Sequence, residues 1–250
     1  VFSGSIIDCV VGQPCATPFP FGGRITKTGT GTLTLAGTNA YGGLTTVSAG
    51  TLLVDGSIAA SEGVVVNDGA TLGGIGTIST GLVLSGGRLA AGNGSIGTLT
   101  ATGDLTFRGG SFYAVDLTPT ENDKTVVEGS ATLGGTVEAS FGAGSYLPNS
   151  YVILSATGGF DGTTFDAFNI VDAPALQASL AYSETEVSID LVAATAQVKG
   201  LTRNQQSVAE KLDEAFNGGG GIGSGFATLL GLPQDQLVDG LSQLSGEAAS

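Results

Sequence analysis

The chain has 250 residues, of which 43 are glycine and 41% are apolar, while only 12% are charged. A disordered chain has the opposite balance, so this one is expected to fold. The formal net charge of −14 disfavours binding to polyanions, and we expect no nucleic-acid partner. The absence of histidine excludes Ser-His-Asp and Cys-His catalysis and histidine-ligated metals.

The first predicted feature is a small loop closed by the only two cysteines, Cys9 and Cys15. We predict a disulfide between them in an oxidising compartment, with two free thiols as the alternative. The chain has no initiator methionine, no signal peptide and no apolar run long enough for a membrane helix, which predicts an internal or processed segment.

Short runs of alternating apolar and polar residues, separated by glycine, fill residues 22–110 and are typical of half-buried β-strands. A glycine followed shortly by a leucine recurs about every 16 to 20 residues. Such a repeat favours a β-solenoid over a β-sandwich, with glycines at the corners because they accept positive φ. The inward-pointing leucines are the predicted structural core: Leu33, Leu52, Leu72, Leu89 and Leu105.

The composition changes twice after the repeats. Most of the 11 phenylalanines and 5 tyrosines fall between residues 107 and 193, where the strands also lengthen. Because the last coil of a solenoid leaves an open edge and an open core, we interpret 107–193 as a β-rich cap. We therefore divide the chain into solenoid coils over 1–106, the cap over 107–193 and a helical linker over 194–250.

Two helices are predicted in the linker. Thr202 and Gln205 fit a capping box, and the apolar face of the helix that follows includes Leu201, Val208, Leu212 and Phe216. A glycine-rich break precedes a second helix over 233–244, with proline in its first turn.

Motifs that suggest chemistry have structural explanations. The match to G-x-G-x-x-G over residues 92–97 is followed by an apparent strand, so we interpret it as a solenoid corner. Glu184, Glu186 and Asp190 alternate with apolar residues, which is typical of a solvated strand face. The remaining acids are scattered among turns, and no serine lies in a G-x-S-x-G context. We therefore predict that the protein is not an enzyme and has no catalytic residue, cofactor or metal site.

Residues 22–58, GGRITKTGTGTLTLAGTNAYGGLTTVSAGTLLVDGSI, strongly resemble the passenger-associated repeat of monomeric (type V) autotransporters of Gram-negative bacteria. Further along, LAAGNGSIGTLTATGDLTF and SYLPNSYVILSATGGFDGTTF resemble the C-terminal passenger and autochaperone segment of that family. LSGEAAS is similar to the entry of the linker into the translocator barrel. Residues 8–21 look like an insertion within the first coil.

The resemblance implies an all-β fold: a right-handed parallel β-helix with a β-hairpin-rich C-terminal cap and a short helical linker. It also implies a structural and secretory module of a surface-displayed passenger, which acts as stalk and folding nucleus during export through the periplasm and across the outer membrane. The implied partner is the protein's own C-terminal translocator β-barrel, which lies outside these residues. The alternative is an adhesin that binds host or sibling-cell surfaces through the solenoid face or the Cys9–Cys15 loop. A polysaccharide-active β-helix enzyme is disfavoured because no acid–base cluster is evident.

Overall fold

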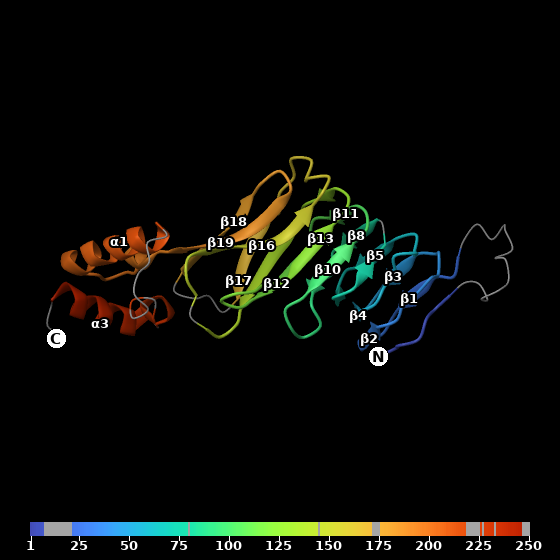
Figure 1. Ribbon diagram of the computed structural model, residues 1–250, viewed down its shortest axis with the longest axis horizontal. Helices are drawn as coiled ribbons and strands as arrows, with labels where there is room; N and C mark the ends of the chain where they lie inside the picture. Colours follow the sequence, from blue (N-terminus) through green and yellow to red (C-terminus); the bar gives the residue numbers. More distant parts are fainter. Residues whose placement is uncertain are drawn as a thin grey trace.

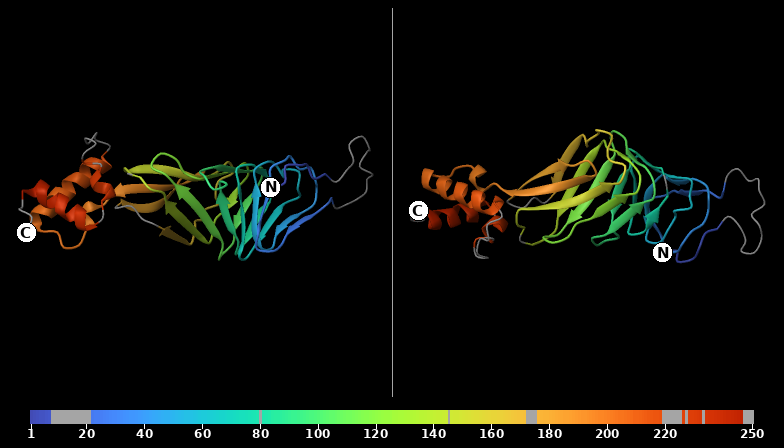
Figure 2. Two further views of the ribbon diagram at one scale, coloured as in Figure 1. Left: turned by 90° about the horizontal axis from the view of Figure 1, so that it is seen from below. Right: turned by 45° about the horizontal axis from the view of Figure 1, so that its top comes forward.

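The chain forms a parallel β-helix followed by two packed helices (Figure 1). The structure is a computed structural model that describes residues 1–7, 22–79, 81–144, 146–171, 176–218, 226, 228–232 and 234–246. The strands wind along the long axis of the molecule, with the first coils at one end and the helices at the other (Figure 2). The predicted solenoid, all-β with a helical C-terminal segment, is confirmed.

Three sheets run the length of the solenoid. Sheet I contains β2 (Thr32–Leu35), β4 (Gly50–Val54), β6 (Ala70–Gly74), β9 (Arg88–Ala91), β12 (Phe112–Leu117), β15 (Thr136–Phe141) and β17 (Ala167–Val171). Sheet II contains β7 (Thr77–Ile78), β10 (Thr98–Ala101), β13 (Lys124–Val127), β16 (Asn149–Ala156), β19 (Glu186–Ala193) and β18 (Leu176–Tyr182). Sheet III contains β1 (Ile25–Lys27), β3 (Thr45–Val47), β5 (Val64–Asn67), β8 (Leu82–Ser85), β11 (Leu105–Phe107) and β14 (Ala131–Thr132).

Within the coils each strand pairs in parallel with its equivalent in the next coil. Parallel pairing requires a crossover between successive strands of one sheet, and here the other faces of the coil provide it. Parallel pairing continues through β17 in sheet I, so it crosses the predicted boundary at residue 107 without a break. Among the strand pairs in the described ranges, the pairing direction changes in sheet II, where β19 pairs antiparallel with both β16 and β18.

Inward-facing side chains from equivalent positions stack into columns that form one core. In sheet I, the register places Leu33, Leu52, Leu72, Leu89 and Tyr113 one above another. Except for Leu33, which is half-buried at the end of the column, these side chains are fully buried. Parallel stacking of like side chains buries a continuous apolar surface, which is the main stabilising term in the fold.

Two kinds of glycine form the corners. Between sheets III and I, Gly50 and Gly69 have φ of 68° and 70°, a conformation that costs glycine little. After sheet I, Gly37, Gly56 and Gly76 occupy equivalent positions, as the bridges between their neighbours show. A Cβ on Gly56 would lie 2.2 Å from the Gly37 carbonyl oxygen, and one on Gly76 would lie 2.0 Å from that of Gly56. This second corner needs glycine because the backbone of the preceding coil occupies the side-chain space.

The helical segment contains η1 (Thr195–Gln197), α1 (Arg203–Asn217), η2 (Thr228–Gly231) and α3 (Gln234–Ser245). The predicted capping box is confirmed: the Thr202 side chain accepts a hydrogen bond from the Gln205 amide, and the Gln205 side chain accepts one from the Thr202 amide. Pro233 lies outside the described residues. None of the helices in the described ranges is both long and apolar enough to span a membrane.

Candidate functional site at the C-terminal cap

The five predicted core leucines occupy two different sheets. Leu52, Leu72 and Leu89 are fully buried in the sheet I column, with half-buried Leu33 at its end. Leu105 is also fully buried but belongs to sheet III, where it stacks on Leu82. Leu105 follows Leu89 by 16 residues, which is shorter than one coil. The glycine and leucine at this point therefore mark a strand of sheet III and not the next strand of sheet I. Tyr113 is the residue that continues the leucine column.

Tyr113 is the centre of an aromatic cluster in the cap. Its ring lies 5.5 Å from that of Phe107 and 5.9 Å from that of Phe165, which in turn lies 5.2 Å from Phe107. The Tyr113 side chain extends from sheet I into the interior of the coil, and its hydroxyl donates a hydrogen bond to the Ile153 carbonyl of sheet II. Burial raises the pKa of Tyr113 well above its usual value, so the hydroxyl stays protonated. Tyr113 and Phe107 lie in register with Leu89 and Leu84 of the preceding coil, and the hydrogen bond of Tyr113 couples sheet I to sheet II.

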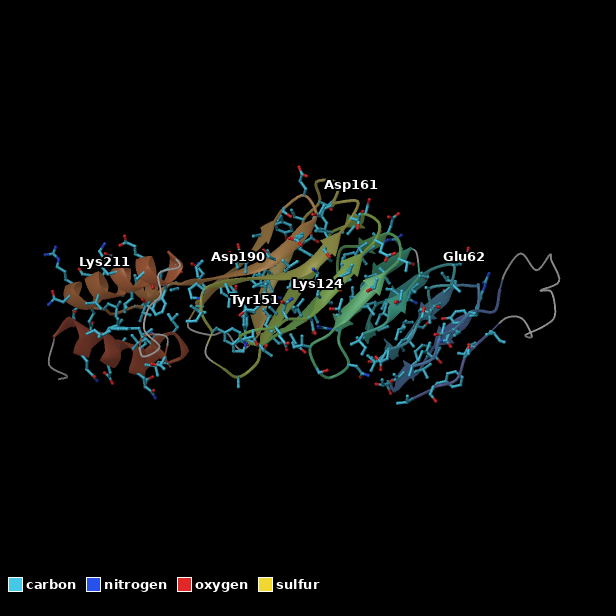
Figure 3. The ribbon with its side chains drawn as sticks, viewed as in Figure 1. Glu62, Lys124, Tyr151, Asp161, Asp190 and Lys211 are labelled. Carbon is cyan, nitrogen blue, oxygen red and sulfur yellow. The ribbon has the colours of Figure 1, made fainter. Side chains whose placement is uncertain are left out.

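The far edge of the cap is an antiparallel meander. The strands β18 and β19 form a hairpin, and β19 lies on β16 with a register shift between Val152 and Leu154. Val187 and Ile189 face the core, whereas Glu186 is exposed, so the predicted solvated face is confirmed. Asp190 lies on the outer face (Figure 3), where its carboxylate accepts hydrogen bonds from the hydroxyls of Ser150 and Ser188. An antiparallel hairpin ends the parallel ladder because it reverses the chain direction.

A buried carboxylate joins two coils at one corner of the cap. Asp123, 2% exposed, accepts hydrogen bonds from the backbone amides of Gly97 (2.8 Å) and Asp116 (3.1 Å). Burial raises the pKa of Asp123 to about 6, against the opposing effect of these two hydrogen bonds. Gly97 ends the G-x-G-x-x-G segment, and strand β10 follows it. The interpretation of that segment as a solenoid corner is confirmed.

The predicted linker-helix residues contribute to two different cores. Leu201, Val208 and Leu212 pack around a small cluster of Ala209, Leu237 and Leu241 between α1 and α3. Phe216 instead belongs to the main core of the β-helix, as does Leu230 of η2. The helical segment is therefore packed against the β structure rather than extending away from it.

Sequence reasoning missed the polar residues that connect α1 to the end of β19. Asp213 accepts hydrogen bonds from the Thr195 amide (2.9 Å), the Thr195 hydroxyl (2.7 Å) and the Ala196 amide (3.0 Å). Asn217, one turn later on the same helix face, accepts from the Ala193 amide and donates to the Ala193 carbonyl. The available signal was the spacing of two short polar side chains four residues apart beside Phe216.

The predicted cysteine loop and the question of a metal site concern residues outside the cap. Cys9, Cys15 and the whole 8–21 insertion lie outside the described residues, so the predicted disulfide and the projecting loop stay predictions. In the part of the chain that the structure describes, no group of three or more Cys, Asp or Glu side chains could hold a metal ion.

Comparison with known proteins agrees with this geometry. The passenger-associated-transport-repeat family model matches residues 25–54, which run from β1 through β4. Two curated proteins of Serratia marcescens, both named extracellular serine protease, are 32% and 31% identical to the chain over 204 residues. The match covers 76% of this chain and 19% of each relative.

The repeat match and the extended similarity together support an autotransporter passenger fragment. They also indicate a secreted or cell-surface location. The passenger chain spans about a fifth of the length of the curated relatives it matches.

The prediction that the protein is not an enzyme is wrong by this comparison, because both relatives are named as proteases. The prediction rested on the absence of histidine and of paired acids. That absence describes only the 250 residues of this chain, and the relatives are about five times longer than the matched segment.

Proposed function

We propose that this passenger segment is the stalk and folding nucleus of an autotransporter that is exported across the outer membrane. The observation that carries the proposal is the asymmetry of the solenoid: a cross-braced aromatic cluster and an antiparallel edge lie at one end, and coils with a mainly aliphatic core, in which Tyr41 is the buried aromatic residue, lie at the other. A coil gains most of its stability from its neighbours, so a cap that folds first offers an edge on which later coils can stack.

We keep the division into coils (1–106), cap (107–193) and linker (194–250) as part of this proposal, with the protein's own translocator β-barrel as the partner. The extracellular location supports a role outside the cell, where folding itself can oppose backsliding of the chain through the membrane.

A matched pair of conservative substitutions tests the folding nucleus. Ile189 in the cap and Ile78 in the coils are both fully buried, and replacing either with valine should cost about 0.5–1.5 kcal/mol of unfolding free energy. We expect Ile189→Val to slow refolding and Ile78→Val to accelerate unfolding, measured by stopped-flow circular dichroism. If Ile78→Val slows refolding as much as Ile189→Val does, the cap is not the nucleus.

We further propose, from the names of the relatives, that the longer protein has extracellular serine protease activity. Because this chain has no histidine, a Ser-His-Asp triad in that protein would need residues outside these 250. A fluorophosphonate probe that labels active-site serines should label the full-length protein and give a single modified serine by mass spectrometry. Absence of labelling in folded full-length protein would reject the protease proposal and leave the stalk proposal untouched.

A further inference from the structure

The β-helix ends in a hairpin that sheet pairing holds on one side only. Among the strands that the structure describes, β18 pairs with β19 alone, and it is the outermost strand of sheet II. Its inward-facing side chains become more exposed toward the turn of the hairpin: Leu176 is buried, Leu180 is half-buried and Tyr182 is 38% exposed. An edge strand with an incompletely covered apolar face should be among the first elements to open.

The helical segment covers the opposite, buried end of this hairpin. Leu176 pairs with Ala193, and Ala193 is the residue whose backbone amide and carbonyl both bond to the Asn217 side chain. Phe216 and Leu230 complete the main core at this end, 8% and 1% exposed. The polar contacts of α1 at Asp213 and Asn217 therefore lie on either side of Phe216 in the sequence, and together they dock the helix at this end of the hairpin.

The strongest docking contact is the Asp213 carboxylate. It accepts three hydrogen bonds from the segment that follows β19, and its Thr195 partner is 1% exposed. Hydrogen bonds to an ionised carboxylate are among the strong ones. Removing the carboxylate would leave the buried Thr195 amide without its acceptor, while the Thr195 hydroxyl would keep only the longer contact of 3.3 Å with the Ala209 carbonyl. Docking of α1 is thus built into the end of β19.

Helix α1 is held in the docked geometry by α3. The side-chain Nε2 of Gln205 donates a hydrogen bond to the Ser242 hydroxyl, which itself donates to the Val238 carbonyl. Gln205 is 5% exposed and simultaneously forms the capping box of α1. The two helices therefore form a small unit with polar and apolar contacts of its own. This unit is joined to the cap through Leu212, which also packs against the main core, and through Ala196 and Val198, which pack against the α1–α3 cluster.

We propose that α1 and α3 form a latch that holds the β18–β19 hairpin closed on the core. When α1 undocks, β18 and β19 open as one unit while the parallel coils stay folded. The latch does not depend on the proposed function in secretion, because it is inferred from contacts within the chain.

Hydrogen–deuterium exchange with mass spectrometry on the 250-residue chain tests the latch. The Asp213→Ala/Asn217→Ala variant removes the docking contacts of both side chains, keeps the longer contact between the Thr195 hydroxyl and the Ala209 carbonyl, and leaves the α1–α3 contacts in place. The matched control is Glu210→Ala on the same helix, whose exposed carboxylate only accepts a hydrogen bond from Gln206. We expect amides of β18 and β19 to exchange at least about tenfold faster in the double variant, with β4, β6 and β9 unchanged and the control like wild type. Wild-type protection of β18 and β19 in the folded double variant would overturn the latch, as would equal loss of protection in the coils.

A second measurement decides the matter if the double variant does not fold. In the wild-type chain at increasing urea below the unfolding transition, a latch requires that β18 and β19 open with α1 or after it. Their amides should then never exchange faster than the most protected amides of α1. Faster opening of β18 and β19 beneath a protected α1 would overturn the proposal.

Discussion

Replacing Gly56 with alanine should destabilise the β-helix because two coils touch at this position. The new Cβ would lie 2.2 Å from the Gly37 carbonyl oxygen and 2.6 Å from that of Ala36, whereas real Cβ atoms essentially never approach closer than 3.0 Å. Both obstructing atoms belong to the backbone, so no side-chain rotation can relieve the overlap. The coils must separate locally by about 0.8 Å, the difference between the two distances.

That displacement determines the expected size of the effect. The Ser57 amide donates to the Gly37 carbonyl at 3.1 Å, and the Gly56 amide donates to the Leu35 carbonyl at 3.0 Å. Lengthening either bond by about 0.8 Å takes it beyond hydrogen-bond range. Two lost bonds and the strain of overpacking should together lower the free energy of unfolding by about 1–3 kcal/mol.

The assay is urea unfolding followed by far-UV circular dichroism, since the chain has no tryptophan. Gly31→Ala is the matched control because no atom lies within 4 Å of its added Cβ and its φ is not in the left-handed region. The control should be neutral or stabilise by up to about 1 kcal/mol. If Gly56→Ala unfolds at the same urea concentration as Gly31→Ala, close backbone contact does not explain the glycine at this corner.

Three further substitutions test the core, the buried carboxylate and the helix cap. Leu72→Ala should cost about 2–5 kcal/mol in the same urea assay, because the side chain is fully buried between Leu52 and Leu89; a cost below that of a surface substitution would contradict the column. The raised pKa of Asp123 means that its protonated form adds stability below pH about 4, and that this stability is lost as the pH rises through about 6. Between pH 4 and 7 the free energy of unfolding of wild type should therefore fall relative to that of Asp123→Asn, and parallel pH profiles would refute the assignment. Thr202→Ala should cost about 1 kcal/mol and increase amide exchange in the first turn of α1, whereas unchanged exchange there would contradict the capping box.

The sequence alone determined the repeating architecture and several local features. Alternation and the glycine-leucine period predicted a solenoid because each coil must present the same inward positions to its neighbours. The capping box at Thr202 and the strand after Gly97 were also predictable, since both depend only on residues nearby in the chain. The aromatic content of the cap was visible for the same reason.

Only the tertiary structure decided how distant segments meet. Leu105 carries the same local pattern as Leu89 yet lies in another sheet, because the number of residues at each corner sets which face a strand reaches. The contacts of Asp213 and Asn217 with the end of β19 and the residues after it could not be predicted either, since most of their partners are backbone groups 17 to 24 positions away that have no sequence signature. Local pattern specifies the coil, whereas long-range backbone geometry decides where the solenoid ends and what closes it.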